Sequence, residues 1–116
     1  MKSINRNIVI IKAKEPFLDW LRKLPDPDTE ITLEFLRSDC LSFLIPETSS
    51  EDEVFAWIGK HYEAIFEAEL FSWHTLEQHW PKSRTFAKFK DWFDVEFHSE
   101  VIDLVDLPIV KEDFIL

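Results

Sequence analysis

Glycine is almost absent from this sequence: among its 116 residues, Gly59 is the one glycine. Phosphate-binding loops and dinucleotide-binding turns need several closely spaced glycines, because the backbone there makes tight turns and approaches the ligand closely. Tight two-residue hairpins favour glycine because they require positive φ angles. The sequence therefore excludes a glycine-rich nucleotide-binding loop, and it predicts few tight hairpins.

Cysteine and long apolar runs are also scarce. Cys40 is the one cysteine, which excludes an internal disulfide framework and indicates a reducing compartment. The first residues include Lys2 and Arg6 but not the apolar stretch of a signal peptide, and the longest apolar runs are too short to span a bilayer. We expect a cytoplasmic protein without a membrane partner.

Positive charge is in deficit, with 13 Lys and Arg against 23 Asp and Glu and a net charge of −10. Such a surface repels phosphate backbones, so we expect no nucleic-acid partner. The imbalance is concentrated in residues 26–77, which carry thirteen acids against Arg37 and Lys60. The simplest interpretation is a solvated acidic surface that keeps the protein soluble.

Aromatic side chains are abundant by contrast, with 11 Phe, 5 Trp and 1 Tyr. Each can bury about 150–250 Å² of surface, so a small fold can gain a substantial core from few residues. Hydrophobic residues make up 46% of the chain, and its length is typical of one domain. We predict a single domain over residues 1–116.

The longest predicted element is a helix over residues 49–73. It opens with two serines followed by three acidic residues, a pattern that favours a helix N-terminus. Proline does not interrupt it, and apolar residues recur at helical spacing from Val54 through Ile58 to Trp73. A helix of this length spans roughly 30 Å, so a sheet can pack along it.

Shorter elements precede and follow this helix. β-Branched runs and alternating polarity predict strands, whereas proline at a helix start and regularly spaced aromatic residues predict helices. The assignments are a strand over residues 7–12, a helix starting at residues 15–16, a strand over 40–45, a helix from Ser83 to Phe93 and a strand over 94–105. Residues 29–39 fit either a strand or a helix; we favour a short helix over 33–37 capped by Thr32.

The resulting order is β-α-(α)-β-α-α-β, which predicts an α+β fold with a small three-stranded sheet and helices packed on one face. The alternation after residue 94 indicates that the opposite face of the sheet contacts water. We expect a core that contains Ile8, Ile10, Leu21, Leu41, Phe43, Ile58, Ile65, Phe66, Phe89, Phe93, Val95 and Phe97.

The last predicted strand carries a row of polar side chains. Asp94, Glu96, His98 and Glu100 alternate along it and therefore share one face, with neighbours roughly 6–7 Å apart. Carboxylate oxygens and an imidazole can ligate a divalent metal, which makes Glu96, His98 and Glu100 metal candidates. A solvent-facing polar strand explains the row more simply, and we expect no metal and no cofactor.

Glu69 falls within the apolar stripe of the predicted long helix. A carboxylate there must reach solvent or meet a polar partner. Arg84, His98 and the Thr85 hydroxyl are the candidate partners, so the sequence predicts a buried polar clamp of Glu69, Arg84 and His98 that ties the helix to a loop. A catalytic acid or base and an exposed carboxylate at the helix edge are the alternatives.

Other residues with catalytic potential give weaker signals. His74 and His79 flank a predicted loop, but neither belongs to a histidine pair with the spacing of a helical zinc motif. Cys40 begins a predicted buried strand and is expected to be a small core residue rather than a nucleophile. The sequence contains no nucleophile motif such as G-x-S-x-G. We therefore assign no catalytic residue.

Several short stretches together give the chain a family likeness. They are PFLDW at 16–20, LIPE at 44–47, WHTLEQHWP at 73–81, RTF at 84–86 and WFDVEFH at 92–98. With these stretches the chain resembles a family of small acidic bacterial proteins that has no assigned function. The resemblance extends over nearly the whole chain, and it implies no activity and no catalytic residue.

These observations favour a non-enzymatic protein-interaction or regulatory module. Tryptophans beyond those that a small core can hold would mark a binding surface. One alternative is a small enzyme or metal-binding protein that uses the strand face of Asp94, Glu96, His98 and Glu100. Another is an acidic nucleic-acid mimic that binds a basic protein, which would require the acids to form a continuous stripe.

The C-terminal residues from 104 onward are too apolar for a free tail. Disordered tails are usually polar, because they cannot bury enough apolar surface to offset the entropy of ordering. Pro108 prevents a continuous central strand. We expect this segment to pack on its own domain, to form a dimer or to bind another protein. The interaction candidates are Trp80, Phe114, Ile115 and Leu116.

Overall fold

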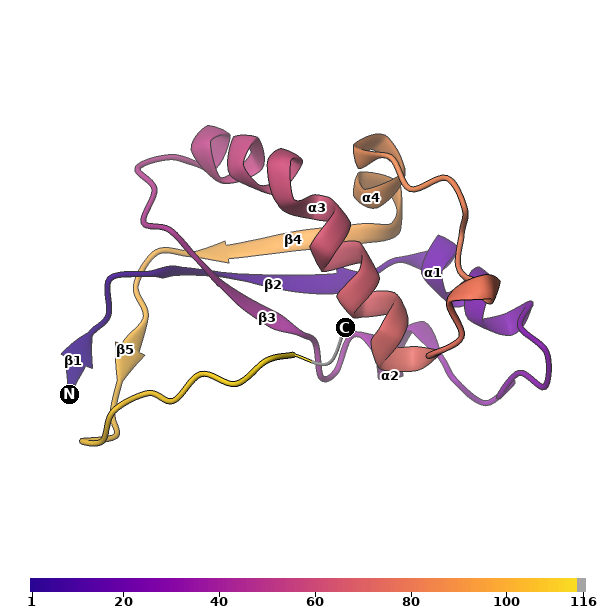
Figure 1. Ribbon diagram of the computed structural model, residues 1–116, viewed down its shortest axis with the longest axis horizontal. Coiled ribbons are helices and arrows are strands. Elements are labelled where there is room, and N and C mark those ends of the chain that lie inside the picture. Colours follow the sequence, from indigo (N-terminus) through magenta and orange to yellow (C-terminus); the bar gives the residue numbers. More distant parts are fainter. Residues whose placement is uncertain (115–116) are drawn as a thin grey trace.

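A small antiparallel sheet lies at the centre of the computed structural model, which describes residues 1–114 (Figure 1). Its strands, in spatial order, are β3 (Ser42–Ile45), β2 (Asn7–Ala13) and β4 (Phe93–His98). Val9 in β2 lies opposite Phe43 on one side and Phe97 on the other. The predicted three-stranded sheet and the α+β class are confirmed.

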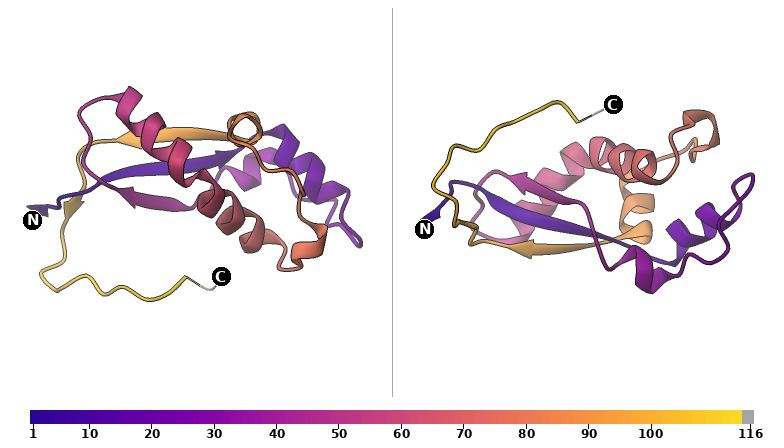
Figure 2. Two further views of the ribbon diagram at one scale, coloured as in Figure 1. Left: turned by 45° about the horizontal axis from the view of Figure 1, so that its top comes forward. Right: turned by 90° about the horizontal axis from the view of Figure 1, so that it is seen from below.

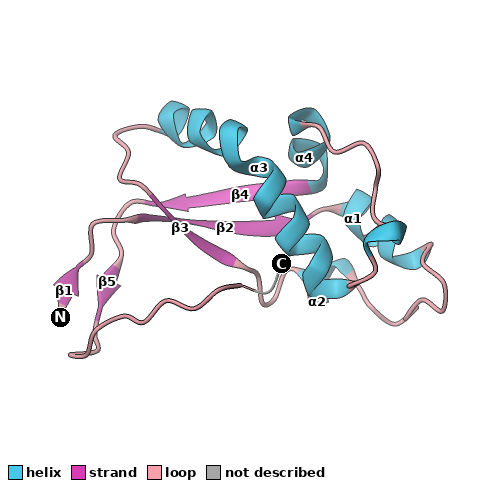
Figure 3. Cartoon of the chain, in the orientation of Figure 1, coloured by secondary structure: helices cyan, strands magenta, loops and turns pink. Residues whose placement is uncertain are grey.

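Helices connect these strands and pack on one face of the sheet. They are α1 (Glu15–Arg22), α2 (Leu33–Leu36), α3 (Glu51–Trp73), the 3-10 turn η1 (Glu77–His79) and α4 (Phe86–Trp92). Figure 2 shows α3 along one side of the sheet, and Figure 3 shows how helices and strands alternate along the chain. Among the described residues, we find no helix with the length and apolar character needed to cross a bilayer.

Side-chain caps define where the helices begin. The Thr32 hydroxyl accepts a hydrogen bond from the Phe35 amide at 3.1 Å, as expected for the short helix α2. At α3, Ser50 caps the Glu53 amide, and the Glu53 carboxylate accepts from the Ser49 amide at 2.9 Å. This reciprocal arrangement is a capping box shifted by one residue, and it satisfies amides that the helix itself leaves free.

Two element boundaries differ from the prediction. Thr85, not Ser83, caps α4 by accepting from the Lys88 amide at 3.1 Å, and the helix ends before Phe93, which begins β4. Strand β3 begins at Ser42 rather than at Cys40, whose thiol approaches the Arg37 carbonyl. At α4 a side-chain hydrogen bond to the backbone marks the start of the helix, and the hydrophobic pattern did not reveal it.

The single glycine marks a close approach between two helices. A Cβ atom at Gly59 in α3 would lie 3.2 Å from the Phe86 ring in α4. That distance is shorter than ordinary van der Waals contact, so any larger residue would displace the ring. Glycine therefore occurs where the spacing between α3 and α4 needs it.

Strand β2 faces the core in the opposite phase to the one predicted. Val9, Ile11 and Ala13 are buried against the helices, whereas Ile8 and Ile10 lie half-buried on the open face of the sheet. Four consecutive apolar residues carry no alternation, so the sequence did not reveal the phase. Leu41, Phe43, Val95 and Phe97 are also half-buried rather than fully buried.

Aromatic rings form most of the interior beneath the helices. Phe17, Phe66 and Phe89 are fully buried and come from three different helices. Phe66 meets Phe93 edge to face, with ring centroids 5.3 Å apart at 90°. Such contacts contribute about 0.5–1.5 kcal/mol beyond the burial of area. The abundance of aromatic residues therefore serves the core.

The predicted strand over residues 94–105 is interrupted. Strand β4 ends at His98, and after a turn a separate strand, β5 (Ile102–Asp103), pairs with β1 (Lys2–Ser3) in a second, two-stranded sheet. The Ile4 amide extends this pairing by donating to the Val101 carbonyl at 3.0 Å. The sequence analysis missed this second sheet because strands of two residues leave no periodic pattern.

The C-terminal segment, residues 104–114, does not pack on its own domain. Every residue in it is exposed, and both views in Figure 2 show it leaving β5 and running outside the body of sheet and helices. The first of the three expectations for this segment is therefore incorrect for the described residues. Ile115 and Leu116, two of the predicted interaction residues, lie outside the described part of the chain.

Candidate functional site

The polar strand face is occupied by ion pairs. Glu96 accepts hydrogen bonds from Lys12 at 3.0 Å and from His98 at 3.1 Å, and Asp94 accepts from Arg37 at 3.0 Å. The hydrogen bonds from Lys12 and His98 hold the pKa of the Glu96 carboxyl below its usual value. The face is therefore a network of neighbouring charges that satisfy one another.

The polar strand face does not bring its three metal candidates together. Glu100 lies beyond the end of β4 and is exposed, so it does not continue the row of Glu96 and His98. Across residues 1–114, we find no cluster of three His, Cys, Asp or Glu side chains able to hold a metal ion. The metal candidates Glu96, His98 and Glu100 thus do not converge.

The predicted clamp is not assembled as expected. Arg84 pairs with Glu67 at 3.2 Å and donates to the Pro81 carbonyl at 2.7 Å, while His98 pairs with Glu96. The structure therefore does not bring Glu69, Arg84 and His98 together. A tie between α3 and the following loop does exist, but Glu67 makes it, two residues before Glu69.

Glu69 is instead buried in α3, and the clamp partners expected for it pair with other residues. Glu69 is only 5% exposed. Its Oε1 atom has no hydrogen-bond partner among the described residues. Burial raises the pKa of the Glu69 carboxyl to about 8, because the charged form loses its hydration. At neutral pH the side chain is therefore mainly the uncharged acid.

A cavity of about 140 Å³ adjoins Glu69; we call it the Glu69 cavity. Its wall is formed by α3 (Glu69, Ser72 and Trp73), by the connection between α2 and β3 (Asp39 and Cys40) and by apolar residues of β2 and α2. Ser72 and Cys40 hydrogen-bond to main-chain carbonyls, with Ser72 Oγ donating to the Ala68 carbonyl at 2.8 Å. The carboxyl groups of Glu69 and Asp39 make no such main-chain bond to any described residue.

Cys40 is half-buried in the wall of this cavity. Its Sγ atom approaches the Arg37 carbonyl at 3.5 Å, consistent with a weak S–H donor. Burial, and secondarily the negative charge of Glu69, raise the pKa of the Cys40 thiol. The thiolate is the nucleophilic form of cysteine, so this environment suppresses nucleophilic reactivity.

His74 and His79 meet in the loop between α3 and α4. His74 Nε2 and His79 Nδ1 are 2.7 Å apart, and the ring centroids are 5.0 Å apart with an angle of 28° between the rings. The centroid distance is close to the N–N distance plus the two ring radii, so the rings meet edge to edge. One of these nitrogens donates its hydrogen and the other accepts it, so the pair does not present two lone pairs to a metal ion.

Tryptophan side chains fasten the same loop. Trp80 Nε1 donates to the His74 carbonyl at 2.7 Å, and Trp20 Nε1 donates to the His79 carbonyl at 3.0 Å. Trp80 is buried at 6% exposure, so this predicted interaction residue belongs to the core and does not form a free surface. The histidine pair and the tryptophans hold the loop in one conformation.

Asn7 is a buried polar residue that the sequence analysis did not single out. Its amide nitrogen donates to the Ser99 carbonyl at 2.8 Å, and its Oδ1 atom accepts from the Thr48 amide at 2.8 Å. These bonds join the loops that follow β4 and β3 to the first residue of β2. An asparagine before a hydrophobic run is a common pattern, so the sequence carried no signal for this role.

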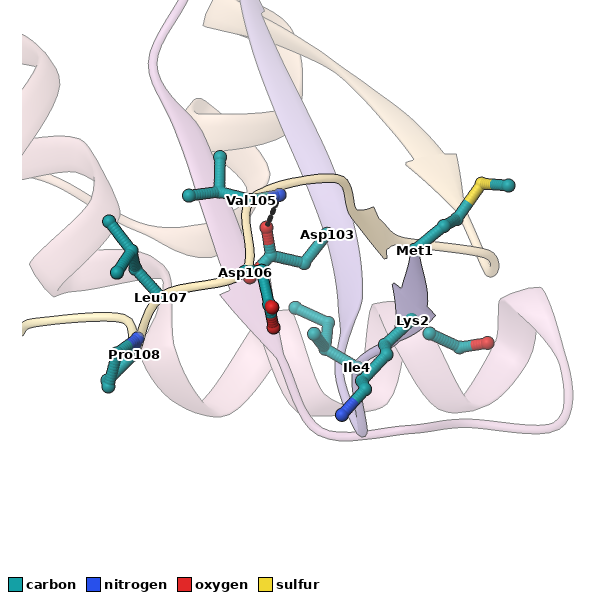
Figure 4. A pocket seen from close by; sticks show the side chains of 9 residues that line it. Met1, Lys2, Ile4, Asp103, Val105, Asp106, Leu107 and Pro108 are labelled. Atoms are coloured by element: carbon teal, nitrogen blue, oxygen red, sulfur yellow. Dashed lines mark hydrogen bonds between the residues drawn. The ribbon is translucent and has the colours of Figure 1, made fainter.

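A second cavity, of about 400 Å³, lies where the C-terminal segment passes the N-terminal strand (Figure 4). Met1, Lys2 and Ile4 line one part of it, and Val105 and Leu107 line another. Figure 4 shows these side chains spread around the opening, with a hydrogen bond of 2.8 Å from the Val105 amide to Asp103. Lys2, Asp103 and Asp106 are the charged residues of the lining, and Asp103 already accepts from the Val105 amide, so we interpret the cavity as an open surface between the N-terminal strand and the start of the C-terminal segment.

Comparisons with family models, with curated proteins and with solved structures produced no match to this chain. The resemblance to a family of small acidic bacterial proteins therefore remains a prediction. Function has to be inferred from the surfaces and cavities described above.

Proposed function

We propose that this protein is a non-enzymatic interaction module that binds a partner protein through its C-terminal segment. The observation that carries this proposal is the exposure of apolar side chains along the segment. Leu104, Leu107 and Val110 are 76%, 72% and 79% exposed. Soluble proteins rarely expose large contiguous apolar surface unless it binds something.

The backbone of the segment supports the same conclusion. Apart from the Val105 amide bond to Asp103, residues 104–114 make no hydrogen bond to other described residues. An extended segment with free amides and carbonyls can add to the edge of a sheet or lie in a groove. Pro108 lacks an amide hydrogen, which favours an edge or a groove over a central strand.

The charge of the protein indicates the kind of partner. With a net charge of −10, two copies of this chain repel each other at low ionic strength. A partner with an apolar groove and basic residues at its rim complements the apolar side chains and the acids Asp106, Glu112 and Asp113 of the segment. We therefore favour a basic protein over a second copy.

Deletion of residues 108–116 tests this proposal. Because described residues of the segment do not pack on the domain, we expect the free energy of unfolding in urea to change by less than about 0.5 kcal/mol. Affinity capture with the full chain as bait should retain a partner that the truncated chain loses. The double variant Leu107→Asp, Val110→Asp should lose it as well.

The control for this experiment is Glu100→Gln, at an exposed position outside the segment, which leaves every apolar and acidic side chain of the segment in place. It should retain the partner when measured beside the double variant. Equal retention by the full chain and the truncated chain would contradict the proposal. A sedimenting dimer that becomes a monomer on truncation would replace the basic partner with a second copy.

A further inference from the structure

The Glu69 cavity is lined by a hydrogen-bonding atom that no described residue of the chain satisfies. Glu69 Oε1 is enclosed and lacks a hydrogen-bond partner among the described residues. An unsatisfied buried polar atom typically costs about 1–3 kcal/mol. A polar group without a partner among the described residues therefore lies in the wall of a cavity, at a point where a ligand could supply the missing hydrogen bond.

The wall of the cavity favours a hydrogen-bond donor with positive charge. Glu69 and Asp39 contribute two carboxyl groups, whereas the described wall contains no Lys, Arg or His side chain. Ser72 and Cys40 already direct their hydrogens at main-chain carbonyls. Lys12 and Arg37 are near enough to act on the Cys40 thiol but do not line the cavity, so an anionic ligand there would contact two carboxyl groups and no base.

The size of the cavity limits what can enter. A volume of about 140 Å³ is the share of about four or five water molecules in the liquid, at roughly 30 Å³ each. An alkylammonium or guanidinium group with a short apolar stem fits this space. The apolar wall from Ile11, Ala13 and Leu36 suits the stem, and Glu69 suits the cationic head.

We propose that the Glu69 cavity binds a compact organic cation, an ammonium or guanidinium group, through an ion pair with Glu69. The cation can be a free amine or the end of a lysine or arginine side chain presented by another protein. The two sources share the same chemistry at the wall. The site is separate from the C-terminal segment, so truncation of residues 108–116 leaves cation binding unchanged whether or not the interaction proposal holds.

Binding of a cation is coupled to the loss of a proton from Glu69. The free carboxyl has a pKa of about 8, so at pH 7 it must ionise before it can form the ion pair. Linkage then requires one proton to leave for each cation bound, and affinity to increase about tenfold per pH unit below pH 8. This coupling distinguishes a site at Glu69 from weak, non-specific binding elsewhere on the acidic surface.

The experiment is a calorimetric titration of the full chain with ethylammonium chloride, with sodium chloride as the ionic control. We expect saturable binding with Kd on the order of 1 mM at pH 8.5, because a ligand of three heavy atoms is limited to about −1.5 kcal/mol per atom. At pH 6 the affinity should be at least tenfold weaker. At pH 7, buffers with different ionisation enthalpies should report one released proton.

Glu69→Gln is the decisive variant, because it keeps the shape of the side chain and removes its charge. It should lose ethylammonium binding, whereas Glu100→Gln, at an exposed site, should bind like the wild type. A capped tripeptide Gly-Lys-Gly then separates the two sources. Tighter binding of free ethylammonium supports a small amine, and tighter binding of the peptide supports a presented side chain.

Three results would overturn the proposal. They are the absence of a saturable signal beyond the sodium chloride control, equal affinity for the wild type and Glu69→Gln, and an affinity that does not change between pH 6 and pH 8.5. The last comparison uses the wild-type protein alone. It therefore decides the question even if Glu69→Gln fails to fold.

Discussion

Asn7 and Glu69 are both buried polar residues, but they differ in how far their side chains are hydrogen-bonded. Asn7 has partners for its amide nitrogen and its oxygen, whereas Glu69 Oε1 has none among the described residues. A satisfied buried polar group stabilises one arrangement of the backbone, and an unsatisfied one lowers stability. Asn7 is therefore expected to be structural, and Glu69 is the residue to examine for a ligand.

Glu69 makes the stability of the protein depend on pH. The ordinary pKa of 4.5 applies to the unfolded chain, whereas burial raises it to about 8 in the folded chain. Between these values the folded state holds a proton that the unfolded state has released, so stability falls as pH rises from 4.5 to 8. At about 1.4 kcal/mol per pKa unit, the loss over this window is on the order of 5 kcal/mol.

Urea unfolding at a series of pH values measures this effect. Between pH 5 and pH 8, Glu69→Gln should become progressively more stable relative to the wild type, because it lacks the titrating group. Glu100→Gln, whose carboxyl is exposed, should follow the wild-type curve. Parallel curves for the wild type and Glu69→Gln would show that Glu69 titrates normally.

Asn7→Ala should destabilise the fold by about 2–3 kcal/mol, since it leaves the Thr48 amide and the Ser99 carbonyl without their side-chain partner. Asn5→Ala, at an exposed position two residues earlier, should change stability by less than about 0.5 kcal/mol. Denaturant midpoints of the two variants give the comparison. Similar midpoints would mean that water replaces the Asn7 bonds at little cost.

At the scale of elements, helices were more predictable than strands. The start of α2 was predicted from Thr32 and the start of α3 from the serines before it. These starts are predictable because a capping side chain bonds to an amide only a few residues away in sequence. The phase of β2 was predicted incorrectly, since the side chains of residues 8–11 are all apolar and burial depends on which face meets α3. The end of β4 depends on a turn held by Asn7, a residue distant in sequence.

The cap of α4 can be tested directly. Thr85→Ala should cost about 1 kcal/mol, because the Lys88 amide loses its acceptor. Ser83→Ala should have almost no effect, since its backbone carbonyl, which Lys88 Nζ contacts, is unchanged. Thermal unfolding of both variants makes this measurement. A larger loss of stability for Ser83→Ala than for Thr85→Ala would indicate that Ser83 caps the helix, as predicted from the sequence.

At the scale of the whole molecule, the α+β class followed from the order of elements, but the candidate site did not. The sequence placed Glu69 within an apolar stripe, which was correct, and then paired it with Arg84, which the structure pairs with Glu67. Both carboxylates lie on the same helix, and only tertiary packing decides which one meets the loop. The cavity beside Glu69 likewise depends on how α2, α3 and β2 pack.

The aromatic core provides a test of the global packing. Phe66→Ala should cost about 3–5 kcal/mol, because the ring is fully buried between helices and sheet. Phe97→Ala should cost less, since Phe97 is half-buried near the end of β4. Guanidinium unfolding of the two variants gives the order. Equal losses would mean that β4 is packed more deeply than its exposure indicates.

The order of strands in the sheet has a consequence for how the chain folds. Strand β2 is central, and it pairs over more residues with β4 than with β3. Strand β4 lies near the opposite end of the sequence. Closing so long a loop costs entropy before its contacts are gained, which slows folding. While the ribosome adds residues, β2 must wait until residue 98 is made. Until then its run of isoleucine and valine lacks one of its two neighbours, and nascent chains in that state are prone to aggregate.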